Sequence, residues 1–569
     1  MGVVVGLNCN HADSAACIIK DNKLLFAVEE ERINRIKHWA GLPIESIKLC
    51  LENTGTKWSE INDITINTNP YSNLHQKVFY FLKNYLRGDK KKEIYKRTKK
   101  KFNIITSINE SLNGEKLLPN TKIHYVDHHL AHISSAFYAS GYDKSIGLSI
   151  DGFGDFCSVA IAKCSEKEIK IIDRVYFPNS LGLFYEAFTQ FIGFKNYGDE
   201  YKMMGLSASG NPKYYDLILN NIFLKKSNKL NLKFFNHTKK DFKYNFEGIP
   251  NQASILNENI IKLFDEKHDY LKEDVAASVQ KIFENKLLEI CKEASALDFS
   301  KNICYAGGCA LNSLANKKLF DSGFFKNVFI PYAPGDAGGS IGSALYFLRN
   351  KEIKKENLNS PYLGPRFENN EIEKIIKNYP EIQKSNIEYI SNKNDLFKNV
   401  ASYISKNNIV GYFNGRMEFG ARSLGNRSIL ANPCGKNIKE IINAKIKRRE
   451  SFRPFAPAIL EDKKIEWFEN SKINPYMSNV ENIQKNKRGI IPAVTHIDGT
   501  GRVQTVSKNL NEDFYNLIFE FYKITDVPIL LNTSFNENEP IVMSPDHAIR
   551  CFLKTNMDLL VLNNYLITR

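Results

Sequence analysis

The chain has 569 residues and a formal net charge of +15; 43% of its residues are hydrophobic and 25% are charged. This length exceeds what one core usually organises and predicts roughly two to four domains. No run of about 18 apolar residues is present, so neither a membrane-spanning helix nor a membrane partner is expected. The first residues carry no basic leader before their apolar run, which predicts a cytoplasmic protein.

Ten cysteines are scattered along the chain without a CxxC pair. This usage is typical of reduced, largely buried thiols and argues against a zinc ribbon or an iron–sulfur cluster. No feature of the sequence indicates an oligomeric state.

Two stretches of the N-terminal half share one pattern. The stretch from Val3 and the stretch from Ser145 each read as an apolar strand, a turn rich in Gly, Asn and Asp, a second strand, a charged turn and a third strand. The repeat predicts two related α/β lobes facing a cleft.

Positive charge is concentrated in residues 87–101, which contain nine basic and two acidic side chains. Such a surplus favours anionic partners, for which nucleotides and phosphates suffice, while nucleic acid stays possible. Few aromatic residues interleave with these charges, so a solvated, Lys-rich helix or loop is the preferred interpretation.

Further along the chain, residues 275–297 space their apolar side chains like an amphipathic helix. The composition then becomes polar and rich in Pro and Gly near residues 351–365, as in a linker. We therefore predict a first domain at 1–355, a linker at 356–370 and a second α/β domain at 371–569.

The motif DHHLAH places His128 and His132 four residues apart, on one face of a helix. Alone, this pair fits an ordinary helix as well as a metal site. Asp151, at the end of a predicted strand, and Asp336, in a loop before a helix, add two carboxylates. Two imidazoles and two carboxylates suit iron(II), manganese or zinc.

Three Gly-rich loops, DGFGD (151–155), AGG (306–308) and PGDAGG (334–339), could let backbone amides approach a phosphate. None matches the Walker loop or the dinucleotide fingerprint. Together with the repeated lobe, they predict a nucleotide in the cleft between the lobes.

Arginines accumulate in the second domain, in Gly- and Pro-punctuated stretches. Guanidinium groups bind phosphate bidentately, and a buried arginine needs a partner, so a doubly anionic substrate is predicted there. The basic residues concerned are Arg416, Arg422, Arg427, Lys445, Lys447, Arg448, Arg449, Arg453 and Arg502, with Asn532 and Ser534 nearby in LLNTSFN.

Taken in order, these motifs resemble the signature of the NodU/CmcH family of carbamoyltransferases, which includes tobramycin-, cephamycin- and Nod-factor-carbamoylating enzymes. The resemblance spans almost the whole chain. The motifs that carry it are GLNCNHADSAA, EEERINRIKH, DHHLAHISSAFY, DGFGD, SLGLFYEAFTQFIGF, DEYKMMGLSASG, GGCALNSLAN, PGDAGGSIGSAL, GRMEFGARSLGNRSIL, KRRESFRPFAPAIL, HIDGTGRVQTV and LLNTSFNENEPIV.

The resemblance implies an N-terminal domain of the actin-like ATPase type, with duplicated RNase H-like lobes, and a YrdC-like α/β C-terminal domain. The second domain would convert carbamoyl phosphate and ATP, with magnesium accompanying the ATP, into carbamoyl adenylate. The first would transfer the carbamoyl group, beside an iron ion, to the hydroxyl of a small-molecule or glycan acceptor.

The resemblance also implies residue roles. As metal ligands it implies His128, His132, Asp151 and Asp336. As ATP or adenylate contacts it implies Gly152, Gly154, Asp155, Gly182, Glu186, Asn312 and Ser534, with Lys447 on the ATP side. As the carbamoyl phosphate site it implies Arg422, Arg453, Arg502 and Asn532. Within these sets, Arg422 and Lys447 would act catalytically.

On the acceptor side, the resemblance implies His11 as a candidate general base and Lys37 and His38 as lining residues. The chain departs from the family here, because the usual His-Asp pair is spaced as His11-Ala12-Asp13. Three alternatives stay open: a tRNA threonylcarbamoyl enzyme, the same chemistry on hydroxymethylated bases of DNA, and a sugar kinase or ATP-binding module. The last leaves the second domain without a role.

Overall fold

The computed structural model divides the chain into two compact units, Met1–Asn359 and Ser360–Arg569, and each is described here by itself. It describes residues 2–85, 104–111, 117, 119–225, 227–239, 242–245, 247–264, 270–470 and 472–569. The basic run at 87–101 lies outside these residues. No described helix has the length and apolar character needed to cross a membrane.

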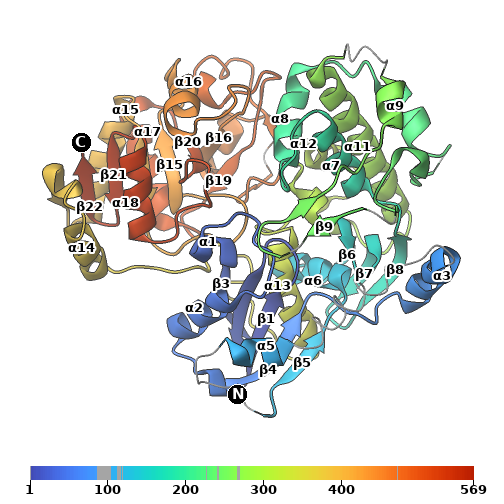
Figure 1. The fold of residues 1–569 in the computed structure, drawn as a ribbon. Coiled ribbons are helices and arrows are strands. Elements are labelled where there is room, and N and C mark those ends of the chain that lie inside the picture. Colours follow the sequence, from blue (N-terminus) through green and yellow to red (C-terminus); the bar gives the residue numbers. More distant parts are fainter. Residues whose placement is uncertain are drawn as a thin grey trace. The chain divides into compact units, whose positions relative to one another are not determined.

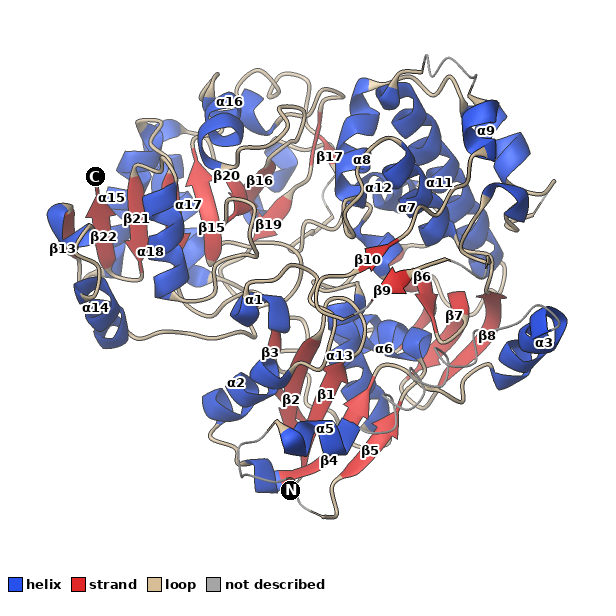
Figure 2. Cartoon of the chain, viewed as in Figure 1, coloured by secondary structure: helices blue, strands red, loops and turns tan. Residues whose placement is uncertain are grey.

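Unit 1 contains two five-stranded sheets with the same strand order and directions (Figures 1 and 2). In each sheet the first three strands in chain order pair antiparallel as neighbours. The fourth and fifth run parallel to the strand that comes first in the chain, β1 or β6. The first sheet is β3 (Lys23–Glu29), β2 (Ala15–Lys20), β1 (Val3–Asn8), β4 (Ile61–Ile66) and β5 (Lys122–Tyr125). The second is β8 (Ile169–Tyr176), β7 (Cys157–Ser165), β6 (Lys144–Gly154), β11 (Asn302–Ala306) and β12 (Asn327–Phe329). The two strand triplets predicted from the sequence are the first three strands of each sheet.

Two helices, α6 (His128–Ser140) and α13 (Asp336–Phe347), pack against each other. α13 lies on β1 and β4 of the first sheet, whereas α6 lies on β6 and β11 of the second. Their contact is close: a Cβ added at Gly342 of α13 would come within 1.9 Å of the carbonyl oxygen of Ala131 in α6. A glycine is therefore required at 342, and the pair of helices joins the two sheets.

The amphipathic pattern at 275–297 forms α11 (Lys272–Ser295), so that prediction is confirmed. Its neighbours in unit 1 are α7 (Leu181–Phe191), α8 (Glu200–Leu206), α9 (Tyr215–Ile222) and α12 (Ser313–Asp321).

Unit 2 is built on one eight-stranded mixed sheet with helices packed on it (Figure 2). Its strand order is β13 (Asn386–Tyr389), β22 (Tyr565–Thr568), β21 (Leu559–Leu562), β14 (Val410–Phe413), β15 (Arg427–Ala431), β20 (Ile529–Ser534), β16 (Ala456–Leu460) and β19 (Gln504–Val506). Its main helices are α14 (Asn369–Lys377), α15 (Lys393–Ser405), α17 (Glu512–Thr525) and α18 (Pro545–Lys554).

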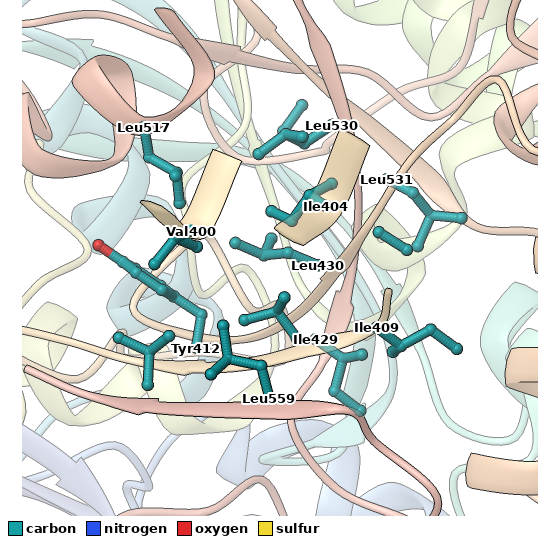
Figure 3. Close-up of a cluster of buried hydrophobic side chains, with 14 of the residues drawn as sticks. Val400, Ile404, Ile409, Tyr412, Ile429, Leu430, Leu517, Leu530, Leu531 and Leu559 are labelled. Carbon is teal, nitrogen blue, oxygen red and sulfur yellow. The ribbon is translucent and has the colours of Figure 1, made fainter. Parts of the chain in front are cut away.

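The core of unit 2 lies where α15 and α17 meet the central strands. Figure 3 shows Val400 and Ile404 of α15 and Leu517 of α17 beside Leu430 of β15 and Leu530 of β20. All five side chains are buried, and burying each large aliphatic side chain contributes roughly 1.5–3 kcal/mol.

The predicted linker at 356–370 is largely integrated into the two units. The Asn357 side chain donates to the carbonyl oxygen of Leu24 in unit 1. In unit 2, Gly364 N donates to the Met417 carbonyl and Phe419 N to that of Pro361. Only a few residues around 359 therefore join the units. The predicted linker was longer because a Pro/Gly-rich composition suits a packed, irregular segment as well as a free linker.

Arg427 is the largest fully buried side chain of the described residues, and it holds this segment to the sheet. Its guanidinium donates to the carbonyls of Asn414 (2.9 Å) and Pro365 (3.1 Å), among others, and lies 3.6 Å from the centre of the Phe413 ring. The prediction that Arg427 belongs with the anion-binding arginines is therefore wrong: its partners are backbone carbonyls and an aromatic face.

Replacing Arg427 with methionine should destabilise the chain by about 2–4 kcal/mol, since several buried carbonyls would lose their donor. Urea denaturation measures the loss. The control is Arg448→Met, because the Arg448 side chain is largely exposed, and it should change stability by less than about 0.5 kcal/mol. Equal stability of both variants would contradict this role of Arg427.

Candidate functional site

The start of helix α6 is fixed by two carboxylates. Asp127, the N-cap, accepts from the backbone N–H groups of His129 and Leu130, each at 3.1 Å. Asp155 Oδ2 accepts from His128 N at 2.9 Å. Helical spacing then brings His128 and His132 onto one face, with their Nε2 atoms 3.1 Å apart, as the sequence predicted.

The two predicted carboxylates meet these imidazoles. Asp151 Oδ2, near the end of β6, lies 3.2 Å from His128 Nε2 and 3.0 Å from His132 Nε2. Asp336 Oδ1, in the first residue of α13, lies 3.6 Å and 3.3 Å from the same two nitrogens. All four side chains offer one atom each to a common point.

This group fits a divalent metal ion. Ligand atoms about 2.1 Å from one ion lie roughly 3.0–3.4 Å from each other. Four of the five spacings above fall in this range, and the fifth, between His128 Nε2 and Asp336 Oδ1, is 3.6 Å. The Asp336 Oδ1 atom is buried and accepts no well-aligned hydrogen bond from the described residues, so it is available to a bound ion. Two nitrogens and two oxygens suit iron(II), manganese or zinc.

The charges of the group also favour a bound cation. Burial alone would lower the pKa of His132, but its interactions with Asp151 and Asp336 outweigh burial and raise this pKa to about 9. Despite burial, the histidines hold the pKa of Asp151 well below its usual value. Two ionised carboxylates thus attract positive charge to this point, whether a proton or a metal ion.

The glycines of DGFGD have different environments. A Cβ added at Gly154 would come within 1.9 Å of His128 Cδ2, whereas one added at Gly152 would meet nothing within 4 Å. Gly182 and Gly308 likewise leave room for Asp151, whose backbone or carboxylate lies within 2.9 Å of their added Cβ atoms. Gly152, Gly154 and Gly308 were predicted to let backbone amides approach a phosphate, and Gly182 to contact the adenylate. The structure gives Gly154, Gly182 and Gly308 a packing role around His128 and Asp151.

The acceptor-side histidines pair with different carboxylates. His11 Nδ1 lies 2.6 Å from Asp336 Oδ2, which places His11 beside the metal-binding group. The displaced Asp13 does not pair with His11; its Oδ1 lies 2.7 Å from His38 Nδ1. Burial opposes protonation of His38, but Asp13 and Glu31 outweigh it and raise its pKa to about 9. Lys37 is exposed.

Unit 2 brings together the arginines predicted to bind carbamoyl phosphate. Burial, together with the charges of Arg422, Arg449 and Arg453, lowers the pKa of Arg502 well below its usual value. The Arg502 Nε atom is buried and has no hydrogen-bond partner among the described residues. Three guanidinium groups close enough to disfavour the charge of a fourth are an arrangement that a bound anion would stabilise. Their role in binding carbamoyl phosphate stays a prediction.

Asn532 borders this arginine cluster. Its Nδ2 donates to Gln504 Oε1 at 2.8 Å and to the Ser423 carbonyl at 3.3 Å, and these residues are sequence neighbours of Arg502 and Arg422. Its Oδ1 is buried without a hydrogen-bond partner among the described residues. The site therefore offers one unused acceptor beside several donors.

Comparison with known proteins finds one family match in each unit. Residues 3–345 match the family described as Carbamoyltransferase N-terminus, and residues 401–569 match Carbamoyltransferase C-terminus. The chain belongs to the carbamoyltransferase family. It is accordingly an enzyme of the carbamoyltransferase class.

Relatives of this carbamoyltransferase align along most of their length. An uncharacterised protein of Synechocystis sp., sll1178, is 36% identical over 100% of this chain and 96% of its own. Nodulation protein NolNO of Sinorhizobium fredii is 35% identical over 98% of this chain and 79% of its own. Among solved structures, full-length HypF in a phosphate- and nucleotide-bound form covers 62% of this chain and 47% of its own at 15% identity with a TM-score of 0.32. A score this low does not establish a common fold.

The predicted adenylate contacts of the carbamoyltransferase lie near the metal-binding group but are already engaged. The Asp155 carboxylate accepts from Thr68 Oγ1 and Asn69 N, each at 2.7 Å, besides His128 N. The Asn312 amide exchanges two hydrogen bonds with Gln280. Glu186 contacts Gln252, and burial raises its pKa well above the usual value. Their nucleotide roles stay predictions.

Lys447 and Ser534, predicted on the ATP side, are in contact. Lys447 Nζ donates to Ser534 Oγ at 3.2 Å and to Asn536 Oδ1 at 2.7 Å, as well as to two backbone carbonyls of the same turn. Burial lowers the pKa of this amine well below its usual value. In this structure Lys447 fixes the 534–536 turn.

The sequence named Arg449 only as one member of a basic run and did not indicate His496. Arg449 lies in a basic run whose members look alike in sequence, and only its contacts separate it from exposed Arg448. His496 precedes Arg502 in the HIDGTGR motif; burial lowers its pKa to about 4, and Arg502 contributes to this shift. The six-residue spacing to Arg502 is the signal that could have drawn attention to it.

Gly154→Ala should abolish tight metal binding, because the added methyl group would displace the His128 ring. Gly152→Ala is the matched control, in the same turn but with open space at its Cβ. Metal content after anaerobic loading with iron(II), measured by elemental mass spectrometry, should fall at least about tenfold in the first variant only. Full metal content in Gly154→Ala, or equal loss in both variants, would contradict the site.

Proposed function

We propose that the chain is an ATP-dependent O-carbamoyltransferase. Unit 2, which we assign to the YrdC-like fold, makes carbamoyl adenylate from carbamoyl phosphate and ATP. Unit 1, which we assign to the actin-like ATPase fold, transfers the carbamoyl group to an acceptor hydroxyl. The repeated strand order of the two sheets in unit 1 supports the second assignment.

One observation carries the proposal. The chain has two distinct centres of different chemistry, the guanidinium cluster of unit 2 and the His/Asp group of unit 1. Activation handles polyphosphate and carbamoyl phosphate, which need fixed positive charge. Transfer needs a polarised carbonyl and a place for the hydroxyl proton. Each centre has the residue types that one half-reaction requires.

The atoms balance when water enters the first half-reaction. Carbamoyl phosphate and water give carbamate and orthophosphate; a carbamate oxygen then attacks the α-phosphorus of ATP, and pyrophosphate leaves. In the second half-reaction the acceptor oxygen attacks the carbamoyl carbon, AMP leaves, and the hydroxyl proton passes to a base. Carbamate itself is a poor electrophile, so the adenylate supplies the leaving group.

The polar groups of unit 2 suit the carbamoyl end of the substrate. Its phosphate oxygens only accept hydrogen bonds, and the arginines only donate them. The carbamoyl NH₂ donates, and the unused Asn532 Oδ1 accepts. This pairing would favour carbamoyl phosphate over an acyl phosphate that has a methyl group in place of NH₂, because Asn532 would then stay unsatisfied.

In unit 1, His128, His132, Asp151 and Asp336 would hold the metal ion, for which we propose iron(II). A bound ion supplies Lewis-acid polarisation of the carbamoyl carbonyl. His11 adjoins this group, and its contact with Asp336 orients the ring as a carboxylate orients a catalytic imidazole. We therefore propose His11 as the residue that receives the proton of the acceptor hydroxyl.

The other proposed participants follow from the substrates. Magnesium accompanies ATP, and the acceptor is a hydroxyl-bearing small molecule or glycan. The alternatives of a tRNA threonylcarbamoyl enzyme and of DNA base carbamoylation gain no support from the described residues, and the basic run that would serve them lies outside these residues. Mass spectrometry of a panel of alcohols, looking for the gain of one carbamoyl group, would identify the acceptor.

Arg502→Ala should lower carbamoyl-phosphate-dependent release of pyrophosphate by about 100-fold or more, since a donor to the developing charge is removed. Transfer from externally supplied carbamoyl adenylate should continue at the wild-type rate. Arg448→Ala, an exposed neighbour of the cluster in sequence, should leave both rates unchanged. Unchanged pyrophosphate release in Arg502→Ala, or loss of both half-reactions, would contradict the assignment of activation to unit 2.

A further inference from the structure

A short segment of unit 1, Gly248–Gln252, runs from the lobe of the first sheet to the lobe of the second, and we call it the strap. It ends in β10 (Asn251–Gln252), which Figure 2 labels beside α7. At one end, Gly248 N donates to the Ala40 carbonyl at 2.8 Å, and Ala40 N donates to the Gly248 carbonyl at 2.9 Å. At the other end, Gln252 Nε2 donates to Glu186 Oε1 in α7. The strap is thus attached to both lobes.

The attachment to the first lobe adjoins the loop that holds His11. Ala40 is buried, and Gly41 follows it in the chain. The Ser14 hydroxyl lies 2.8 Å from the carbonyl oxygen of Gly41 and 3.0 Å from that of His11. His11 in turn contacts Asp336 of the metal-binding group. One end of the strap is therefore connected to this group through a short series of contacts.

The attachment to the second lobe approaches the metal-binding group from the other side. Burial, with the charges of Glu200 and Asp151, raises the pKa of Glu186 well above its usual value. Glu186 thus lies close enough to the metal ligand Asp151 to be affected by its charge. The contacts form a closed circuit that passes through Asp336, His11, Ser14, Gly41, Ala40, the strap, Glu186 and Asp151.

The strap itself has little packing to hold it in place. Among its residues only Pro250 is buried, whereas Ile249 is 67% exposed. Gly248 has a backbone φ of 74°, in the left-handed region that favours glycine, and contributes no side chain. A surface segment held by a few polar contacts opens at a much lower free-energy cost than the whole domain.

We propose that the strap is a gate at the metal-binding group. It separates from Ala40 to admit the acceptor and pairs with Ala40 again to keep water out during carbamoyl transfer. This inference rests on the transfer proposed for unit 1. A carbamoyl adenylate reacts with whichever nucleophile reaches it, so a closed gate suppresses its hydrolysis. Segments that close over a reaction centre and reopen between turnovers are a common means of doing this.

Gly248→Pro tests the gate, because proline has no N–H for the Ala40 carbonyl and cannot adopt a φ of 74°. Hydrogen–deuterium exchange of the full-length protein should show the Ala40 amide exchanging at least about tenfold faster than in the wild type. After loading with iron(II), and with carbamoyl adenylate supplied without an acceptor, AMP release by hydrolysis should also rise at least about tenfold.

Two further variants at neighbouring positions make the test specific. Gly248→Ala keeps the N–H but strains the backbone, so both rates should change in the same direction by a smaller factor. Ile249→Ala is the matched control, since it shortens an exposed side chain of the strap and leaves both backbone hydrogen bonds in place. It should exchange and hydrolyse like the wild type.

The possible failures are distinguishable. An unchanged exchange rate at Ala40 in Gly248→Pro would show that these hydrogen bonds do not hold the strap, and would overturn the gate. Faster exchange with wild-type AMP release would overturn it as well. A wild type that does not bind carbamoyl adenylate in equilibrium dialysis would instead contradict the proposed transfer, and the gate with it.

Discussion

The close contact between helices α6 and α13 is the constraint on which unit 1 depends. Each helix covers a different sheet, and each begins with a residue of the metal-binding group, His128 in α6 and Asp336 in α13. Gly342 allows the helices to approach until an added Cβ would overlap a carbonyl of α6. This helix pair links the two sheets. The positions of the four donor atoms therefore depend on how the two lobes are joined.

The same turn that supplies Asp151 also fixes the start of α6. Asp155 accepts from the first backbone N–H of the helix, and Gly154 lies against the His128 ring. Asp151, Asp155 and Gly154 therefore lie within five residues at the end of one strand. A shift of this turn would move all three together. Unit 2 differs, because burial and the charges of Arg422, Arg449 and Arg453 lower the pKa of Arg502. Such a perturbed group is a candidate for a site that an anion completes.

The sequence predicted those features that depend on local geometry. Residues four apart on a helix share a face, so the spacing of His128 and His132 was enough to pair them. The repeated strand pattern likewise follows from alternation along the chain. The pairing of Asp13 with His38, the carbonyl partners of Arg427 and the packing role of Gly154 could not be predicted. Each depends on which segments, distant in sequence, the fold brings into contact.

Arginine illustrates this limit most clearly. Arg422, Arg427 and Arg449 look equivalent in sequence, as charged residues in Gly- or Lys-rich stretches. In the structure the charges of the first and third lower the pKa of Arg502, whereas Arg427 is surrounded by backbone carbonyls. Composition thus predicts that an anion site exists in unit 2, but only tertiary contacts decide which guanidinium groups form it.

The division of labour between the two centres can be measured directly in a chain whose metal-binding group is disabled. Asp336→Asn should be supplied with ¹³C-labelled carbamoyl phosphate and ATP, and its products identified by mass spectrometry. Labelled carbamoyl adenylate should accumulate, with one pyrophosphate per adenylate and no carbamoylated acceptor. Absence of the adenylate in a folded Asp336→Asn protein, under conditions where the wild type releases pyrophosphate, would contradict the claim that unit 2 activates the carbamoyl group independently.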